Sequence, residues 1–250
     1  MTGDAGTGGP MEFYSRGRGI IRPETTAIDL PAEKAVMCFT EGFYPRLVKC
    51  LGLSDAEPAP GFGGCQKGRM SQDLILLKSD IGAPAAAMAM EVMIASGVRK
   101  VLMLGVAGSL SPSCPIGSCV IPTWGIREEG TSYHYLPSRV CPKPSMRFVR
   151  ELRDALSSLE PELGGVWSTD APYRETVGKI KEYAGKGVLA ADMETTAMMA
   201  VAMRRKAEFA AVLTISDLMY GAEWAPAFGT RKLRRARDAA CEKASAVMLG

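Results

Sequence analysis

Short apolar runs alternate with longer segments that favour helices along most of the chain. The runs have the length and continuous hydrophobicity of strands that are buried on both faces of a sheet. The segments between them have the length and residue types of helices. We expect strands at 35–39, 73–78, 100–106, 119–122, 165–169, 187–191 and 209–216, and helices at 84–96, 145–159, from near Met193 onward and at 231–248. Such alternation predicts an α/β layered fold with a mixed, largely parallel central sheet flanked by helices.

Two segments break this pattern because they are rich in glycine, proline and small polar residues. Residues 1–19 are predicted to be a flexible leader, and residues 54–69 a surface loop. No linker of convincing length and no internal repeat divides the remainder. The sequence therefore predicts a single domain over residues 20–250, preceded by the leader.

Composition narrows the class of protein. Hydrophobic residues make up 47% of the chain and charged residues 23%, which is typical of a soluble globular protein. The net charge of +3 is too small to indicate a nucleic-acid or membrane surface, and the basic run at 231–237 is typical of a solvated helix face. No apolar run reaches the ~20 residues that span a bilayer. We expect a small molecule as ligand, and neither nucleic acid nor membrane as partner.

Cysteine and histidine usage indicates the compartment and argues against some site types. The seven cysteines are odd in number, none has CxxC spacing, and the chain does not start with a secretory signal. Reduced thiols in a cytoplasmic protein are the simplest interpretation. His134 is the only histidine, so a His-rich metal site is excluded and a Cys/His catalytic pair is disfavoured. We expect no metal and no organic cofactor.

Candidate binding loops follow the predicted strands, where ligands collect in open α/β sheets. In "SDIGAPAA" (79–86), Gly82 allows close backbone approach, and the helix that follows offers free N–H groups to an anion. In "LGVAGSL" (104–110), successive backbone N–H groups between Gly105 and Gly108 are able to form an anion nest. Each segment by itself is equally consistent with a tight turn.

Two further strand ends carry acids. Asp192 and Glu194 precede an apolar helix, where Asp192 is suited to cap the helix and Glu194 to its first turn, since the helix dipole favours negative charge there. Ser216 and Asp217 close a strand of nearly pure hydrophobes. Apolar walls favour the protonated form of such an acid and equip it to donate a proton. The structural alternative is that Asp217 caps the next element.

The segment "REEGTSYHYLP" (127–137) is dense in polar and aromatic residues. Two interpretations stay open on composition: the segment lines a pocket, or it is a hydrogen-bonded excursion with His134 satisfied in the interior.

Taken in order, four of these motifs resemble the nucleoside phosphorylase family, which includes purine nucleoside and uridine phosphorylases. They are the 73–110 stretch ending in "GVAGSL", "IGSCVIPTWGIREEGTSYHY", "DMETTA" and "TISD", and together they cover Asp73 to Asp217. The resemblance implies the phosphorylase-type single-domain α/β fold and a homo-oligomer, either a dimer or a hexamer.

The resemblance also implies roles for individual residues. Glu194 is expected to accept hydrogen bonds from ribose hydroxyls, Met193 to pack under the sugar, and Asp217 to help protonate the base. The segment "STDAPY" (168–173) resembles a base-stacking stretch in which Tyr173 is kept. The further substrate-binding candidates are Val106, Ala107, Gly108, His134 and Ser216, and the phosphate-binding candidates are Gly82, Gly105 and Arg46.

Phosphate binding is where the chain departs from the family. Met103 and Val106 stand where family members carry an arginine and a hydroxyl that bind phosphate, and the loss of both weakens such binding. Arg46 resembles another phosphate arginine with imperfect spacing, and a neighbouring subunit is a second possible source of a cation.

The predicted function is therefore phosphorolysis of a purine nucleoside, or of both purine and pyrimidine nucleosides. Phosphate is the co-substrate, and the products are the free base and pentose 1-phosphate. The first alternative is a nucleosidase that uses water. The second is a non-catalytic nucleoside-binding module.

Overall fold

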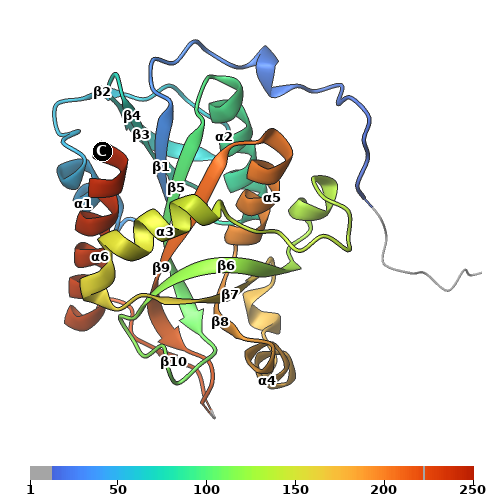
Figure 1. Cartoon of the computed structure of the whole chain (residues 1–250), viewed down its shortest axis with the longest axis vertical. Helices are drawn as coiled ribbons and strands as arrows, with labels where there is room; N and C mark the ends of the chain where they lie inside the picture. Colours follow the sequence, from blue (N-terminus) through green and yellow to red (C-terminus); the bar gives the residue numbers. More distant parts are fainter. Residues whose placement is uncertain (1–12, 222) are drawn as a thin grey trace, which may run out of the picture.

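The computed structural model describes residues 13–221 and 223–250, which fold into one layered α/β body (Figure 1). Its strands are β1 (Lys34–Cys38), β2 (Glu57–Pro58), β3 (Cys65–Met70), β4 (Leu74–Ser79), β5 (Lys100–Ser109), β6 (Cys119–Glu128), β7 (Glu162–Thr169), β8 (Val188–Asp192), β9 (Glu208–Leu218) and β10 (Ala225–Pro226). Its helices are α1 (Tyr44–Cys50), α2 (Ala83–Ala95), α3 (Met146–Ala155), α4 (Val177–Gly185), α5 (Thr195–Arg205) and α6 (Arg231–Leu249).

The strands form one mixed sheet in the order β10-β9-β6-β7-β8-β5-β1-β4-β3-β2. The long pairings β1–β4, β1–β5, β5–β9 and β6–β7 are parallel, as the sequence predicts. An additional β5–β9 pairing joins the two halves, so that β5, β9, β6, β7 and β8 close into a ring. The carboxyl ends of β5 and β9 therefore meet β8 at one end of the molecule.

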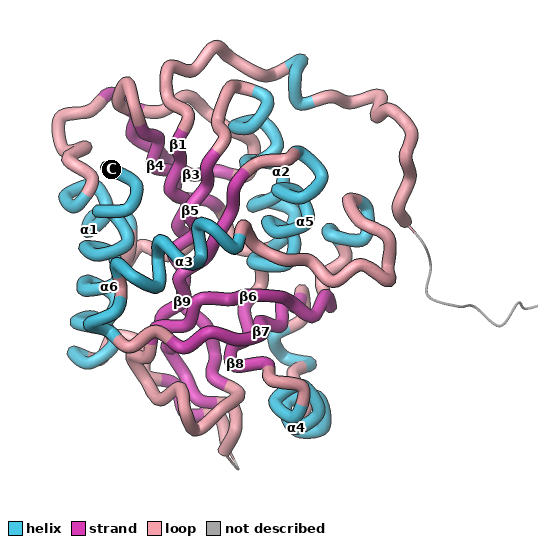
Figure 2. Tube along the Cα trace, in the orientation of Figure 1, coloured by secondary structure: helices cyan, strands magenta, loops and turns pink. Residues whose placement is uncertain are grey.

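Helices cover the two faces of the sheet (Figure 2). On one face, α2 and α5 pack over buried side chains of β1, β5 and β9, among them Met103, Phe209 and Leu213. On the other face, α1, α3 and α6 cover a second apolar cluster that includes Leu102, Phe148 and Val212. Successive residues of β5 and β9 thus alternate between two cores, which explains why both strands are hydrophobic without interruption.

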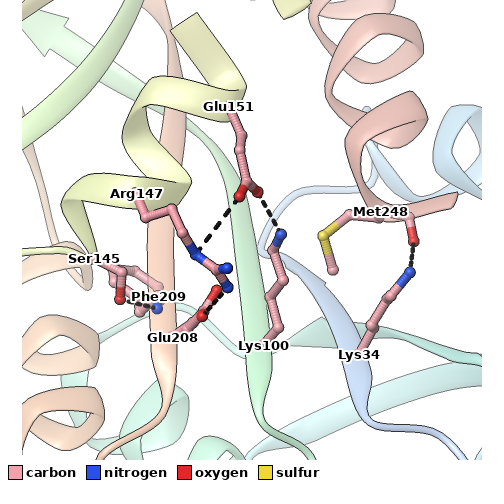
Figure 3. Close-up of polar contacts among 8 residues, drawn as sticks. All are labelled: Lys34, Lys100, Ser145, Arg147, Glu151, Glu208, Phe209 and Met248. Carbon is pink, nitrogen blue, oxygen red and sulfur yellow. Dashed lines mark hydrogen bonds and ion pairs between the residues drawn. The ribbon is translucent and has the colours of Figure 1, made fainter. Parts of the chain in front are cut away.

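Charged residues gather at the amino ends of the strands (Figure 3). Lys34 begins β1 and donates to a carbonyl in the last turn of α6 at 2.9 Å. Lys100 begins β5 and donates to Glu151 of α3 at 2.6 Å, while Arg147 pairs with Glu208 at the start of β9. These charges satisfy one another at this end of the sheet, and the opposite end is where a cavity forms.

Several sequence predictions need correction. The predicted loop at 54–69 contains β2 and most of β3, a half-exposed strand near the sheet edge whose polar residues hide its periodicity. The helices α1 and α4 were not predicted, because each is short and carries few buried residues. The predicted helix at 145–159 ends at Ala155, and a 3-10 turn (Ser157–Leu159) follows.

The predicted flexible leader lies mostly outside the described residues, which begin at Phe13. From there to β1 the chain is irregular except for the 3-10 turn Pro23–Thr25, and it crosses the end of α2 (Figure 1). The backbone N–H groups of Ile28 and Leu30 donate to the side chain and the carbonyl of Ser96 at 3.1 and 3.3 Å.

All seven cysteines are free, consistent with the reduced thiols predicted from their number. Within the described part of the chain, no helix has the length and apolar character needed to cross a membrane.

The buried ring of Phe209 in β9 is a test of the packing between the sheet and α5. Phe209→Ala is expected to lower the free energy of unfolding by about 3–5 kcal/mol, since the ring is fully buried and its removal leaves a cavity. Leu249→Ala, at a side chain that is 57% exposed, is the control and is expected to change it by less than about 0.5 kcal/mol. Urea unfolding of both variants measures the difference, and equal losses would contradict the assignment of Phe209 to the core.

Candidate active site

A cavity of about 520 Å³ opens at the carboxyl ends of β5, β8 and β9. Its volume is within the range of small-molecule sites. Nine of the residues predicted from sequence line it: Gly105, Val106, Ala107, Gly108, Tyr173, Met193, Glu194, Ser216 and Asp217. The sequence motifs that lie far apart in the chain therefore meet around one space.

Glu194 lies between β8 and α5 and is 5% exposed. It occupies the residue before the first turn of α5, and its Oε1 accepts a hydrogen bond from the Gly82 N–H at 2.6 Å. Gly82 has a φ of +108°, a conformation that favours glycine, and this geometry directs its N–H towards the carboxylate. Burial, together with the negative charge of Asp192, raises the pKa of Glu194 to about 8.

The side chain of Asp192, the last residue of β8, binds the start of α5 as predicted, although the N-cap position itself is occupied by Glu194, whose side chain makes no capping hydrogen bond. Asp192 Oδ2 accepts hydrogen bonds from the N–H and the hydroxyl of Thr195, and its Oδ1 accepts from the Ser168 hydroxyl. Burial raises the pKa of Asp192. Its side chain is thus fixed by the chain itself, whereas Glu194, which was expected in the first turn of the helix, lies just ahead of it at the cavity.

Asp217 reaches the cavity through a β-bulge. The β5–β9 register shifts between Ala107 and Gly108, which leaves Ser216 as the extra residue, and both Ser216 and Asp217 line the cavity. The Ser216 hydroxyl lies 2.6 Å from Asp217 Oδ1, and Trp224 Nε1 donates to Asp217 Oδ2 at 2.8 Å. The strand continues through Leu218, so Asp217 does not cap a following element.

Gly108 leaves space for the side chains of Asp217 and Met219. A Cβ atom at residue 108 would lie 2.3 Å from the sulfur of Met219 and 2.9 Å from Asp217 Oδ2. Both distances are too short for real contacts, so a side chain at this position would displace the thioether and the carboxyl group from where they lie.

Sequence reasoning missed three contributors from loops: Glu175, Trp224 and Phe228. Glu175 follows the 3-10 turn Pro172–Arg174 and lines the cavity half-buried. Burial and the negative charge of Asp217 raise its pKa to about 7. Trp224 precedes β10 and, with Phe228, adds aromatic surface at the cavity mouth, the two ring centroids being 6.0 Å apart. The only sequence signal was an acid and two aromatics in short loops, which is too common to be specific.

All the ionisable side chains with ordinary acidic or basic charge that line the cavity are acids. Among the described residues that line it, no lysine, arginine or histidine is present. Met103, at the predicted arginine position, is buried in the core, and its sulfur accepts from the Thr195 hydroxyl at 3.4 Å. The acids that line the cavity are Glu175, Asp192, Glu194, Asp217 and Glu223. The site is therefore suited to a neutral or cationic ligand with hydrogen-bond donors and a flat apolar part.

Three predicted site residues do not line the cavity: His134, Arg46 and Gly82. His134 is exposed, does not line the cavity, and stacks on the ring of Phe13 with centroids 5.0 Å apart. Its segment is a hydrogen-bonded excursion, held by the buried Arg127, which donates to the carbonyls of Leu136 and Pro137. Both alternatives left open for residues 127–137 hold in part: residues 127–130 and Tyr133 line a second, more open pocket, and the segment is also a hydrogen-bonded excursion. His134 lines neither pocket and is not in the interior.

Arg46 of α1 is also outside the cavity lining. Its Nη2 pairs with Glu242 of α6 at 2.9 Å. Its Nε is buried and, among the described residues, has no hydrogen-bond partner. Gly82, the third phosphate candidate besides Gly105, already donates its N–H to the Glu194 carboxyl group.

For a metal, residues 13–221 and 223–250 hold no group of three or more histidine, cysteine or acidic side chains arranged to bind one. Hydrogen-bond donors and acceptors and apolar surface are thus what these residues offer a ligand.

Comparison with known proteins agrees with this architecture. A family model described as "Phosphorylase superfamily" matches residues 33–249. Guanosine phosphorylase of Halorubrum lacusprofundi is 30% identical over 145 residues, which cover 57% of this chain and 60% of that relative. The match thus spans less than two thirds of the relative's length.

Two solved structures share the fold. Uridine phosphorylase from Vibrio fischeri superposes with a TM-score of 0.73 at 21% identity, covering 90% of this chain and 92% of that one. AMP nucleosidase from Bacteroides thetaiotaomicron gives a TM-score of 0.64 at 24% identity, covering 75% and 81%.

The buried carboxyl of Glu194 predicts a pH-dependent stability. Because its pKa is raised from 4.5 to about 8, the native state holds this proton more tightly than the unfolded chain, and stability falls as pH rises between these values. Glu194→Gln removes the ionisation while keeping the acceptor for Gly82. The variant is expected to gain stability relative to the parent by a few kcal/mol across this window.

Thermal melts of parent and variant from pH 4.5 to 9 measure the difference. Glu182→Gln, at an exposed acid of α4, is the control and is expected to show a constant offset. A constant offset for Glu194→Gln as well would mean that Glu194 is not a buried, protonated acid in the native state.

Proposed function

The chain belongs to the phosphorylase superfamily, and on that basis we propose that it cleaves the N-glycosidic bond of a purine nucleoside. It is an enzyme of the nucleoside phosphorylase and nucleosidase type, in which the pentosyl group passes to phosphate or to water. The choice of a purine is supported by the 30% identity to a guanosine phosphorylase. The sugar binds at one end of the cavity and the base at the other, and water accepts the pentosyl group.

The sugar end is formed by Glu194 and Met193. The Glu194 carboxyl is buried, its Oε1 is anchored by Gly82, and it lines the cavity, so its acceptor capacity is directed at ribose hydroxyls. With its pKa at about 8, this carboxyl is largely protonated at neutral pH, so it offers ribose both a donor O–H and an acceptor oxygen. The half-buried Met193 offers a polarisable apolar surface beneath the sugar.

The base end lies between β9 and the loops that carry Tyr173 and Trp224. These aromatic side chains offer flat surface to a purine, while Asp217 and Glu175 offer carboxyl groups to its ring nitrogens. Cleavage of the bond passes through an oxocarbenium-like sugar, and the base leaves as an anion unless it is protonated. A carboxylic acid at this end therefore lowers the barrier.

The acid-only lining is the observation that carries the choice of water. Phosphate is a dianion near neutral pH, and a lining of acids repels it wherever one of them is ionised, since charges interact strongly where water is excluded. No cation among the described lining residues offsets that repulsion. Water carries no such penalty, so hydrolysis to base and free pentose is the reaction that this cavity supports best.

Phosphorolysis is the second candidate, and a specific observation favours it. Arg46 carries a buried Nε without a hydrogen-bond partner in the described chain, which is costly unless a ligand or another subunit supplies an acceptor. A homo-oligomer in which a second copy contributes a cation to the cavity would provide the missing phosphate site.

The identity of the sugar product distinguishes the two candidates. With guanosine or inosine as substrate, we expect free ribose and base at a rate that added phosphate does not raise. Chromatography of the sugar product, with and without phosphate, measures this. Formation of ribose 1-phosphate, or a reaction that needs phosphate, would show that the second candidate is correct.

The role of Glu194 predicts a loss in substrate capture. Glu194→Gln is expected to lower kcat/KM by about 10–100-fold, because the amide N–H₂ that replaces one carboxyl oxygen no longer accepts from a ribose hydroxyl, and leaving that group unpaired costs about 1–3 kcal/mol. Asp154→Asn, at an exposed acid of α3, is the control and is expected to leave kcat/KM unchanged. Steady-state kinetics with guanosine measure both, and unchanged kcat/KM in Glu194→Gln would exclude Glu194 from the sugar site.

A further inference from the structure

We propose that Ser168, one residue before the end of β7, is a positioning residue that leaves the Glu194 carboxyl free for the sugar. This inference rests on the proposed function and concerns how the same site is held. Its premise is geometric. The N–H groups that begin α5 are bound by the side chains of Ser168 and Asp192, and not by Glu194, which occupies the N-cap position.

The N-cap position ordinarily commits its side chain to the helix. The first N–H groups of a helix have no partner within it, and the N-cap side chain commonly accepts one of them. A carboxyl group is suited to that role, because the N-terminal end of a helix favours negative charge. At α5 this would turn Glu194 towards its own helix and away from the cavity. Instead, its side chain makes no capping hydrogen bond and accepts from the N–H of Gly82 at 2.6 Å.

Two side chains from the neighbouring strands take over the capping of α5. The Asp192 carboxyl accepts the N–H of Thr195, the first residue of the helix, at 3.0 Å. The Ser168 hydroxyl accepts the N–H of Thr196, the second residue, at 3.0 Å, and donates to Asp192 Oδ1. Ser168 and Asp192 are partners in the parallel β7–β8 register, so the sheet fixes both groups relative to the helix. Ser168 and Thr196 are fully buried, so bulk water does not reach this N–H group.

The side chain of Thr196 holds the start of the helix independently of Ser168. Its hydroxyl donates to Glu129 Oε1 at 2.8 Å, and Glu129 Oε2 accepts the N–H of Ser132 at 2.8 Å. The polar segment 127–137 thus anchors the first turn of α5 through Glu129, which does not line the active-site cavity. The helix start therefore keeps an anchor when the Ser168 hydroxyl is removed, and the group left without a partner is the Thr196 N–H.

Removal of the Ser168 hydroxyl creates a competition for Glu194. A buried N–H group without a partner is costly, and the side chain at the N-cap position is the group that ordinarily accepts it. When Glu194 accepts the Thr196 N–H, its carboxyl leaves Gly82 and the ribose hydroxyls. Ser168 therefore acts on the sugar through Glu194, without touching the sugar itself.

The kinetic test uses two ligands that differ in the sugar. Ser168→Ala is expected to lower kcat/KM with guanosine by about 5–30-fold, the range of one lost capping interaction. The inhibition constant of 2′,3′-dideoxyguanosine, which lacks the hydroxyls that Glu194 binds, is expected to stay unchanged. A general loss of packing would weaken both ligands. Ser96→Ala, at a buried serine beyond the far end of α2, is the control and is expected to change neither constant.

A double-mutant cycle tests whether Ser168 acts through Glu194. In the Glu194→Gln background, Ser168→Ala is expected to cause no further loss with guanosine, because the group that it positions has already been changed. Losses that multiply would mean that the two residues act independently. All assays are run with and without phosphate, so that the outcome does not depend on the acceptor.

A crystal structure of Ser168→Ala tests the geometry without any activity. We expect the Glu194 carboxyl to lie within hydrogen-bond distance of the Thr196 N–H and no longer of Gly82. The assignment is overturned if Glu194 keeps its bond to Gly82, if both ligands weaken equally, or if the losses in the cycle multiply. If the parent enzyme releases no base from guanosine, the proposed function fails, and the crystal structure still decides the role of Ser168.

Discussion

The hydrogen bond from Gly82 to Glu194 joins two parts of the chain that are 112 residues apart, and the site depends on it. Gly82 opens α2 and Glu194 opens α5, the two helices that share one face of the sheet. A buried carboxyl without such a donor would be strongly unfavourable. By accepting this N–H, Glu194 is held at the cavity instead of turning to solvent, and the starts of the two helices are brought together where β5, β8 and β9 end.

The electrostatic character of the cavity follows from the same arrangement. Lysine and arginine side chains that begin or flank the strands at the amino ends pair with nearby acids, so none of them extends along the sheet to the opposite end. The carboxyl groups at the cavity are instead stabilised by neutral donors: a backbone N–H, hydroxyls and an indole. Because neutral donors do not cancel the charge of a carboxylate, each carboxyl group can still exchange a proton with a ligand. A cavity built in this way is suited to proton transfer, whereas an anion-binding cavity needs cationic side chains.

Much of the fold and part of the site could be predicted from sequence, for identifiable reasons. The central strands β5 and β9 are long hydrophobic runs because both of their faces are buried, so they can be recognised from the sequence alone. β3 and α4 were missed because both are short and largely exposed or half-exposed, so neither has a clear hydrophobic period. Glu194 and Asp217 were found because each ends a predicted strand, whereas Glu175 and Trp224 come from loops whose path only the folded chain defines. His134 was predicted as a substrate-binding residue because it lies within a family motif, but its ring stacks on Phe13 at the protein surface.

Trp224 has one further consequence. Its indole is 60% exposed at the cavity mouth while its N–H is bonded to Asp217, whereas the ring of Trp167 is fully enclosed in the protein. A ligand that reaches Asp217 changes the polarity and hydration around the Trp224 indole, while Trp167 and the third tryptophan, Trp124, do not line the cavity. Occupancy of the cavity is therefore coupled to intrinsic fluorescence, and the molecule carries its own optical reporter for binding.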